Sequence, residues 1–312
     1  MSNFTNEDGF ILNAFSSKMV LHALYFVLFL IIYLVTILGN MLIIFVSSVD
    51  HHLQTPMYFL LRNLSFMDIC YTSTTLPQIL TSLHLKYPAI SFAACIAQQY
   101  FFLTLAASES SLLATMAYDR YVAICFPLRY VTIMNKEACL KMTVTTWLIG
   151  CIYGVVHTAN TFRLPFCGSK ILNHFFCDIP PLLKISCIDT YFNEVTIFVV
   201  GGFLMLGCFL LILGSYMSIL SSIFNIPKGF GREKAFSTCV SHLIVVLLFY
   251  GSGSFMYFRP KSNHLADKEW LLSIFYTSIT PLLNPLIYSL RNKDIQEALL
   301  KQLKLRVMLR YS

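Results

Sequence analysis

Seven long apolar stretches, separated by short polar segments, constrain this chain more than any other feature. A hydrocarbon core about 30 Å thick is crossed by a helix of roughly 20 apolar residues. Only helices and closed barrels satisfy the backbone in lipid, and these stretches are far longer than barrel strands of roughly ten residues. We therefore predict transmembrane helices near residues 20–47, 56–80, 92–124, 138–161, 192–224, 235–258 and 270–290.

Composition supports lipid rather than water as the solvent. Hydrophobic residues make up 57% of the chain and charged residues 12%, whereas a soluble protein has about a quarter of its residues charged. The net charge of +7 is typical of nucleic-acid partners. Here the basic residues are spread between the apolar stretches, so we interpret them as signals of membrane topology. The prediction is an all-α membrane protein, a seven-transmembrane helix bundle with no nucleic-acid partner.

The chain divides into three predicted regions: an extracellular N-terminus (1–19), the seven-transmembrane bundle (20–291) and a cytoplasmic tail (292–312). Lys and Arg are more numerous on the side of the membrane that would hold Arg120, which places that side in the cytoplasm. Asn3-Phe-Thr5 is a glycosylation acceptor and agrees with an outer N-terminus. The tail predicts a short amphipathic helix on the inner leaflet, the alternative being a frayed basic tail. Its apolar stripe consists of Ile295, Leu299, Leu303 and Val307.

Four of the ten cysteines fall at a helix mouth or in one polar loop. They are Cys95, Cys167, Cys177 and Cys187. An even number on one side of the membrane indicates disulfides and an oxidising compartment, although four cysteines allow three pairings and spacing does not choose among them. The string His174-Phe-Phe-Cys177-Asp178 is also a weak metal candidate, because His and Cys suit copper or zinc. A disulfide at Cys177 would remove the thiolate ligand, so we expect no metal.

The third stretch ends in Asp119-Arg120-Tyr121, within the string MAYDRYVAICFPLRY (116–130). The three residues alone are consistent with simple anchoring at the membrane surface. The longer string resembles the signature of the olfactory (odorant) branch of rhodopsin-like G-protein-coupled receptors. Further strings match that family in the same order, so the resemblance covers nearly the whole chain and indicates the tetrapod-type, class II-like branch. They are Gly39-Asn40, TPMYFLLRNLSFMDIC (55–70), KAFSTCVSHL (234–243) and PLLNPLIYSLRNKD (281–294).

The resemblance implies a multi-pass receptor of the plasma membrane that is not an enzyme. Such a receptor binds a small volatile molecule and activates an olfactory-type stimulatory G protein, which raises cAMP. It also implies the pairs Cys95–Cys177 and Cys167–Cys187. Pro285 removes one helix hydrogen bond, which suits a conformational switch. The coupling and switch residues that the resemblance implies are Asp119, Arg120, Tyr121, Tyr216, Asn284, Pro285 and Tyr288.

Asp68 and Glu109 are the two carboxylates well inside the predicted spans. Buried acids in membrane helices are functional candidates. Asp68 matches the acid that binds sodium in many related receptors, so we expect one sodium ion between the two acids and otherwise no cofactor. The alternative is a hydrogen-bonded polar cluster in which one acid is protonated.

The family pattern also implies an apolar pocket with a few hydroxyl groups. No carboxylate lies between Cys95 and Glu109, and no lysine lies in the seventh stretch, so the sequence predicts a small, neutral and largely apolar ligand. A non-olfactory chemosensory receptor is the alternative. A transporter is disfavoured because no internal repeat is visible. The predicted ligand-binding residues are Phe102, Leu103, Ala106, Ala107, Val200, Gly201, Leu204, Tyr250, Gly253, Ser254, Tyr257, Ile274 and Thr277.

Overall fold

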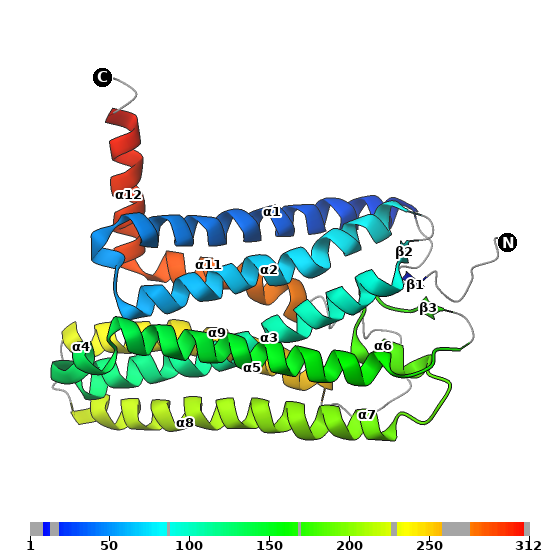
Figure 1. Ribbon diagram of the computed structural model, residues 1–312. Coiled ribbons are helices and arrows are strands. Elements are labelled where there is room, and N and C mark those ends of the chain that lie inside the picture. The colour runs from blue at the N-terminus through cyan, green and yellow to red at the C-terminus, as the bar shows by residue number, and fades with distance from the viewer. Residues whose placement is uncertain are drawn as a thin grey trace.

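The computed structural model describes residues 9–12, 19–85, 88–167, 170–225, 230–257 and 275–308. Within these residues, seven long helical segments lie alongside one another and confirm the predicted bundle (Figure 1). Their bounds are α1 (Met19–Val49), α2 (Pro56–His84), α3 (Phe92–Cys125), α5 (Lys136–Phe162), the continuous α7 (Tyr191–Thr196), η3 (Ile197–Gly201) and α8 (Gly202–Asn225), α9 (Phe230–Tyr257), and η5 (Phe275–Ile279) with α11 (Thr280–Arg291).

Shorter elements join these helices. They are η1 (His51–Leu53), η2 (Pro127–Arg129), α4 (Tyr130–Ile133), α6 (Ile179–Lys184), the C-terminal helix α12 (Lys293–Met308) and the strands β1 (Phe10–Leu12), β2 (Ala89–Ile90) and β3 (Ile171–Leu172).

Several helices begin where the sequence supplies a start signal. Pro56 occupies the first turn of α2, where the missing N–H has no helical partner to lose. Ser91 caps α3 by accepting from the N–H of Ala94 at 3.2 Å, and Asn135 caps α5 by accepting from the N–H of Ala138 at 2.8 Å. The predicted starts at residues 56 and 92 therefore agree with the structure.

The helices differ in how apolar they are. In the described part of the chain, three helical segments are both long enough and apolar enough to cross a membrane by composition alone: His22–Val49, Lys136–Phe162 and Tyr191–Asn225. The central α3 is less apolar because it turns polar side chains such as Ser108, Glu109 and Asp119 into the bundle, where all three are buried. A helix surrounded by other helices satisfies these groups within the protein instead of exposing them to lipid.

Two glycines allow α5 to approach α3 closely. A Cβ atom at Gly150 would collide with Ser108, and one at Gly154 would collide with Thr104. The spacing Gly-x-x-x-Gly places both on one face of α5, as in other tightly packed membrane helices. The close approach explains why α3 and α5 form the most extensive helix pair of the bundle.

The two ends of the bundle are built differently. At one end, which we call the disulfide end, β1 pairs antiparallel with β2 and parallel with β3. Phe10 and Leu12 of β1 are buried there beside the Cys95–Cys177 disulfide, at the end of the bundle where Figure 1 labels the three strands. This small sheet was not predicted. It joins three short segments, near residues 10, 90 and 171, that are far apart in the sequence.

At the opposite end, which we call the Arg120 end, α12 runs transverse to the bundle helices (Figure 1). The predicted C-terminal helix is thus present, with Ile295 buried and Leu299 partly buried against the bundle. Its start is fixed by the Tyr58 hydroxyl, which donates to Asp294 Oδ2 at 3.1 Å and lies 3.0 Å from the side-chain nitrogen of Asn292.

Candidate functional site

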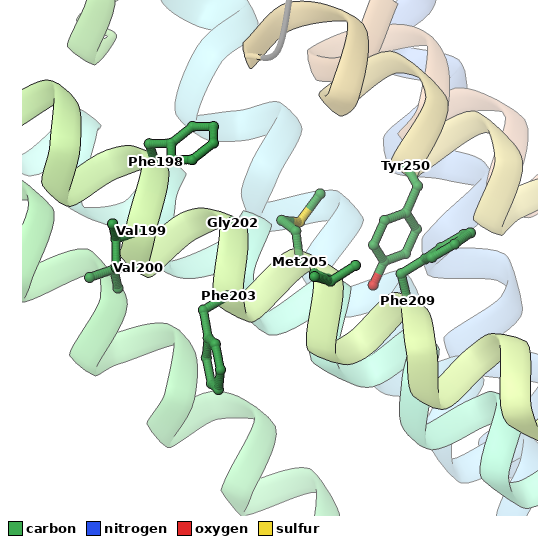
Figure 2. A pocket seen from close by; sticks show the side chains of 9 residues that line it. Phe198, Val199, Val200, Gly202, Phe203, Met205, Phe209 and Tyr250 are labelled. Atoms are coloured by element: carbon green, nitrogen blue, oxygen red, sulfur yellow. The ribbon is translucent and has the colours of Figure 1, made fainter.

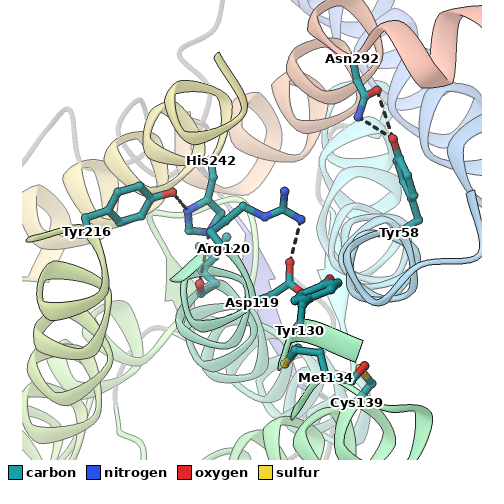
Figure 3. Close-up of polar contacts among 10 residues, drawn as sticks. Tyr58, Asp119, Arg120, Tyr130, Met134, Cys139, Tyr216, His242 and Asn292 are labelled. Atoms are coloured by element: carbon teal, nitrogen blue, oxygen red, sulfur yellow. Dashed lines mark hydrogen bonds and ion pairs between the residues drawn. The ribbon is translucent and has the colours of Figure 1, made fainter. Parts of the chain in front are cut away.

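The Arg120 end holds a compact polar cluster at the end of α3. Nη2 of Arg120 lies 2.7 Å from Oδ2 of Asp119, and the Asp119 carboxylate is fully buried (Figure 3). The second carboxylate oxygen of Asp119 accepts from the Tyr130 hydroxyl at 2.7 Å. Burial and the neighbouring Asp119 carboxylate raise the pKa of Tyr130, so this hydroxyl stays protonated and remains a donor. Asp119 is thereby held from two sides, and it holds the Arg120 guanidinium in turn.

A second polar contact at this end ties three helices together. The Tyr216 hydroxyl of α8 lies 2.8 Å from Nδ1 of His242 on α9, and Nε2 of His242 lies 3.2 Å from the Leu113 carbonyl on α3 (Figure 3). A carbonyl only accepts, so Nε2 carries the ring proton and Nδ1 accepts from the tyrosine. The hydrogen bonds therefore fix α9 to both α3 and α8 at the level of Arg120.

His242 is a functional candidate that sequence reasoning missed. It lies in the string KAFSTCVSHL, which was used only to identify the family. A histidine in an apolar helix was itself a usable signal, because intramembrane ionisable residues usually have a specific partner. Its partner Tyr216 was predicted, and the structure brings the two together.

The other predicted switch residues lie on α3 and α11. The Tyr121 ring lies edge-on to Phe126, with centroids 5.6 Å apart. Pro285 lies inside α11 and closely contacts α1, where a Cβ atom at Gly39 would lie 3.2 Å from the proline ring. Tyr288 is buried, and its hydroxyl has no hydrogen-bond partner among the described residues. This tyrosine is therefore available for a partner in a different arrangement of the helices.

The two intramembrane acids lie in the centre of the bundle. Both carboxylate oxygens of Asp68 accept from the Asn284 side-chain nitrogen, at 3.0 and 3.1 Å. Oε1 of Glu109 and the side-chain oxygens of Asn40 and Asn284 are buried without a partner in the described part of the chain. The hydroxyl of Ser110, the residue after Glu109, lies 2.8 Å from the Tyr250 hydroxyl.

Two disulfides hold the long loop between α5 and α7. Cys95–Cys177 ties the loop to α3, and Cys167–Cys187 links two positions within the loop. These are the pairs that the resemblance implied. The backbone N–H of Cys177 also donates to the side-chain oxygen of Gln98 at 2.9 Å, which holds the loop against α3. With Cys177 in a disulfide, the thiolate of the metal candidate is absent. No cluster of three or more potential metal ligands occurs among the described His, Cys, Asp and Glu residues.

In the disulfide half of the bundle, a cavity of about 860 Å³ forms a groove beside α8. We call it the α8 groove. Its lining runs from Phe198 in η3 to Phe209 in α8, with Tyr250 contributed by α9 (Figure 2). Among the described lining residues, the Tyr250 hydroxyl is the one polar side-chain group apart from the thioether of Met205. The groove therefore offers apolar area and shape, with a single hydroxyl at its floor.

The structure brings part of the predicted ligand set to this groove. Val200 and Tyr250 line it, and a Cβ atom at Gly253 would lie 3.7 Å from Met205 of the lining. Gly201 is buried instead against Tyr153 of α5, and Leu204 packs partly buried against the core.

The predicted residues of α3 and η5 are not among the described lining residues of this groove. The Phe102 ring contacts Tyr71 and Phe176, with centroids 5.1 and 4.9 Å apart. Leu103 and Ala107 are buried, Ala106 is partly buried, and Thr277 of η5 is buried. Ser254 and Tyr257 belong to α9, but their side chains are outside what the structure describes, as are Ile274 and Asn3 altogether.

Comparisons with known proteins agree with the geometry. Residues 29–306 match the olfactory receptor family. The chain is 48% identical to olfactory receptor 1468 of Rattus norvegicus over 89% of each chain. It is 48% identical to olfactory receptor 11L1 of Homo sapiens, over 97% of this chain and 94% of the relative. Its fold is similar to squid rhodopsin, with a TM-score of 0.72 at 18% identity, over 94% of this chain and 88% of that one. The chain therefore belongs to the olfactory receptor family of G-protein-coupled receptors, which are membrane receptors and not enzymes.

Proposed function

We propose that this receptor binds small, neutral, mostly apolar volatile molecules in the disulfide half of its bundle. In response it activates an olfactory-type stimulatory G protein at the Arg120 end and raises cAMP. The α8 groove carries this proposal, because its described lining is apolar with one hydroxyl. Its volume of about 860 Å³ lies within the roughly 300–1,000 Å³ of small-molecule sites.

The proposed ligand site consists of the α8 groove and the helices beside it. A charged ligand would need a buried counter-charge, and the stretch of α3 between Cys95 and Glu109 has no carboxylate to supply one. Small apolar ligands that lack charge anchors gain affinity mainly from burial, so broad tuning follows. The residues proposed for the site remain Phe102, Leu103, Ala106, Ala107, Val200, Gly201, Leu204, Tyr250, Gly253, Ser254, Tyr257, Ile274 and Thr277.

We place the disulfide end outside the cell and the Arg120 end in the cytoplasm. Disulfides persist in oxidising compartments, and both disulfides lie at one end of the bundle. The basic residues of the chain favour the opposite end. In this orientation Asn3 is outside and available for glycosylation, and α12 lies along the inner leaflet of the plasma membrane.

The contacts at the Arg120 end support a closed, uncoupled arrangement. Arg120 is held by Asp119, and α9 is held to α3 and α8 through His242. Outward movement of α9 would break the His242 contacts and uncover Arg120, which would then leave Asp119 to meet the G protein. Pro285 loosens α11 near Tyr288, whose buried hydroxyl is without a described partner and would gain one in the open state.

A sodium ion between Asp68 and Glu109 is also part of the proposal. Hard cations prefer oxygen ligands. The unpartnered oxygens of Asn40, Glu109 and Asn284 belong to three helices that pack around Asp68 of α2, so the donor set fits a cation. When bound, the ion would supply one positive charge and so offset one of the two negative charges of the acids. Asn284 positions the Asp68 carboxylate through its side-chain nitrogen.

The test is a screen of volatile compounds against cells that express the receptor, with cAMP as the readout and Arg120→Ala as the matched variant. We expect a ligand-dependent rise in cAMP that the variant loses at equal surface amount. A rise that persists in Arg120→Ala would contradict the coupling assignment. A response confined to involatile, water-soluble compounds would favour a non-olfactory chemosensory receptor instead.

A further inference from the structure

The α8 groove opens sideways. Residues of η3 and α8 that line it are among the most exposed of the chain, with Phe198 at 65% and Phe203 at 82% exposure. The helical segment that carries them, Tyr191–Asn225, is apolar enough to cross a membrane. The exposed side chains around the groove therefore face the acyl chains of the bilayer rather than water.

The groove is long compared with the thickness of the hydrocarbon layer. Phe198 and Phe209 lie eleven residues apart, which corresponds to about 17 Å along a helix. This is roughly half of a hydrocarbon core about 30 Å thick. The groove therefore extends along the lipid-facing side of the bundle instead of opening only at the membrane surface.

By contrast, the described residues at the disulfide end form a packed cover. Phe10 and Leu12 of β1 are buried, and Phe175 and Phe176 of the loop are fully buried. Ile11 and Leu12 of β1 also donate backbone hydrogen bonds to Lys170 and Pro88, at 2.8 and 2.9 Å. Among the described residues, a ligand that approaches from the extracellular solvent is blocked by this cover. A ligand that approaches from the bilayer instead reaches an open groove.

Met205 is placed to close the groove. Its terminal methyl group lies 3.7 Å from the position of a Cβ atom at Gly253 of α9. Figure 2 shows Met205 projecting beside Tyr250, while Phe203 points away from α9. Methionine has an unbranched, flexible side chain, and the glycine opposite leaves room for it to move. Rotation of this one side chain widens or narrows the space between α8 and the Tyr250 floor.

We propose that the α8 groove is a lateral portal, through which an apolar ligand passes from the bilayer to the floor at Tyr250, with Met205 as its closure. The inference deepens the proposed function and rests on it. A mostly apolar ligand concentrates in lipid before it reaches the protein. Each added methylene raises its concentration in the bilayer about fourfold, so a lateral portal favours longer, more apolar ligands.

Two glycines of α8 provide a matched pair of variants. A Cβ atom at Gly202 meets nothing within 4 Å, and Gly202 lines the groove. A Cβ atom at Gly207 also meets nothing within 4 Å, but Gly207 is not among the described lining residues. Gly202→Phe therefore adds bulk to the groove from a position where a Cβ atom is free of contacts, and Gly207→Phe adds the same side chain elsewhere on the same helix.

The experiment uses the full-length receptor in phospholipid nanodiscs with decyl diazirine, an apolar photo-crosslinker that dissolves in the bilayer. Labelling of Tyr250 is compared with labelling of lipid-facing Leu211 by mass spectrometry of peptides. We expect Tyr250 to be labelled in the parent, at least fivefold less in Gly202→Phe, and equally in Gly207→Phe. Leu211, which is 65% exposed on α8 and is not among the described lining residues, serves as the reference that stays constant. A charged, water-soluble diazirine is expected to leave Tyr250 unlabelled.

Three outcomes would overturn the portal: an unlabelled Tyr250 in the parent, equal labelling in Gly202→Phe, or strong labelling of Tyr250 by the charged probe. If Gly202→Phe fails to fold, Met205→Ala replaces it and is expected to increase labelling of Tyr250. No labelling step depends on a G protein or on a known odorant. Failure of the cAMP assay with intact labelling would therefore contradict the proposed function, whereas failure of labelling contradicts the portal.

Discussion

The Arg120 end and the α8 groove are held together by different interactions: hydrogen bonds at the first and apolar packing at the second. At the Arg120 end, Asp119 accepts from Arg120 and Tyr130 at 2.7 Å each, and His242 joins three helices through two hydrogen bonds. In the groove, one hydroxyl, that of Tyr250, stands among aliphatic and aromatic side chains. Directional contacts hold the first region in one arrangement, whereas the second is defined by shape alone.

The difference indicates which region can vary without loss of the other. Buried hydrogen-bonded groups tolerate few replacements, because a buried donor or acceptor left without its partner lowers the stability by roughly 1–3 kcal/mol. Apolar side chains can be replaced by others of similar volume with a loss of stability of less than about 1.5 kcal/mol. A receptor built this way keeps its coupling end constant while its groove changes ligand preference.

Loss of the Cys95–Cys177 disulfide should have the largest effect on the amount of receptor. It closes a loop of 82 residues, against 20 for Cys167–Cys187. Loop entropy then predicts losses of about 4.5 and about 3.3 kcal/mol, respectively. Cys95→Ser should lower surface receptor, measured by flow cytometry, more than tenfold and more than Cys187→Ser does. The reverse order would show that the disulfide half is not held mainly by the long closure.

His242→Phe should have the next largest effect, on signalling without ligand. It removes the hydrogen bonds to Tyr216 and the Leu113 carbonyl, a loss of about 1–3 kcal/mol for the arrangement seen here. Basal cAMP should rise about tenfold at equal surface amount. Tyr216→Phe, which removes only one of the two bonds, should raise it less. Unchanged basal cAMP in His242→Phe would mean that this contact does not hold the bundle closed.

Tyr250→Phe should have a smaller and ligand-dependent effect. The change keeps the ring in the groove and removes the hydroxyl that lies 2.8 Å from Ser110, a net loss of about 1 kcal/mol. Half-maximal ligand concentrations should shift by less than about tenfold, with hydroxylated ligands affected more than purely apolar ones. Equal shifts for every ligand would argue against Tyr250 as the floor of the groove.

Lys301→Ala should have the smallest effect. Nζ of Lys301 lies 3.6 Å from the Asp50 carboxylate, but the lysine is 59% exposed, and solvent screening leaves such pairs little effect on stability. The backbone N–H of His52, and then Lys301, hold the pKa of Asp50 below its usual range. The stabilisation is therefore complete at neutral pH and is lost only as the pH falls through that lowered pKa. cAMP responses at pH 6 and pH 7.5 should differ little between Lys301→Ala and the parent, whereas a large loss would assign α12 a stronger role.

The sequence predicted the parts of the fold that depend on local signals. Apolar length identified the helices, and it placed the starts of α2 and α3 correctly at residues 56 and 92. The pairing of β1 with β2 and β3 was missed because it joins short segments far apart in the chain. The π-helical turn at Ile197–Gly201 has no sequence signature that we recognise.

The same limit applies to the site. The Asp119–Arg120 pair was predicted because its residues are adjacent in a recognisable string. Tyr216 was predicted but its partner His242 was not, since their contact crosses from α8 to α9. The α8 groove depends on how far α9 lies from α8, and no apolar pattern in either helix encodes that distance.

The most direct test of the separation between the two regions is one matrix of dose responses. Volatile ligands of graded chain length would be applied to the parent, to Val200→Phe in the groove and to Arg120→Lys at the coupling end, with cAMP normalised to surface receptor. We predict that Val200→Phe reorders the ligands while the best of them still reaches the parental maximum, and that Arg120→Lys lowers every maximum by the same factor without reordering. A reordering by Arg120→Lys, or a uniform loss with Val200→Phe, would contradict the account.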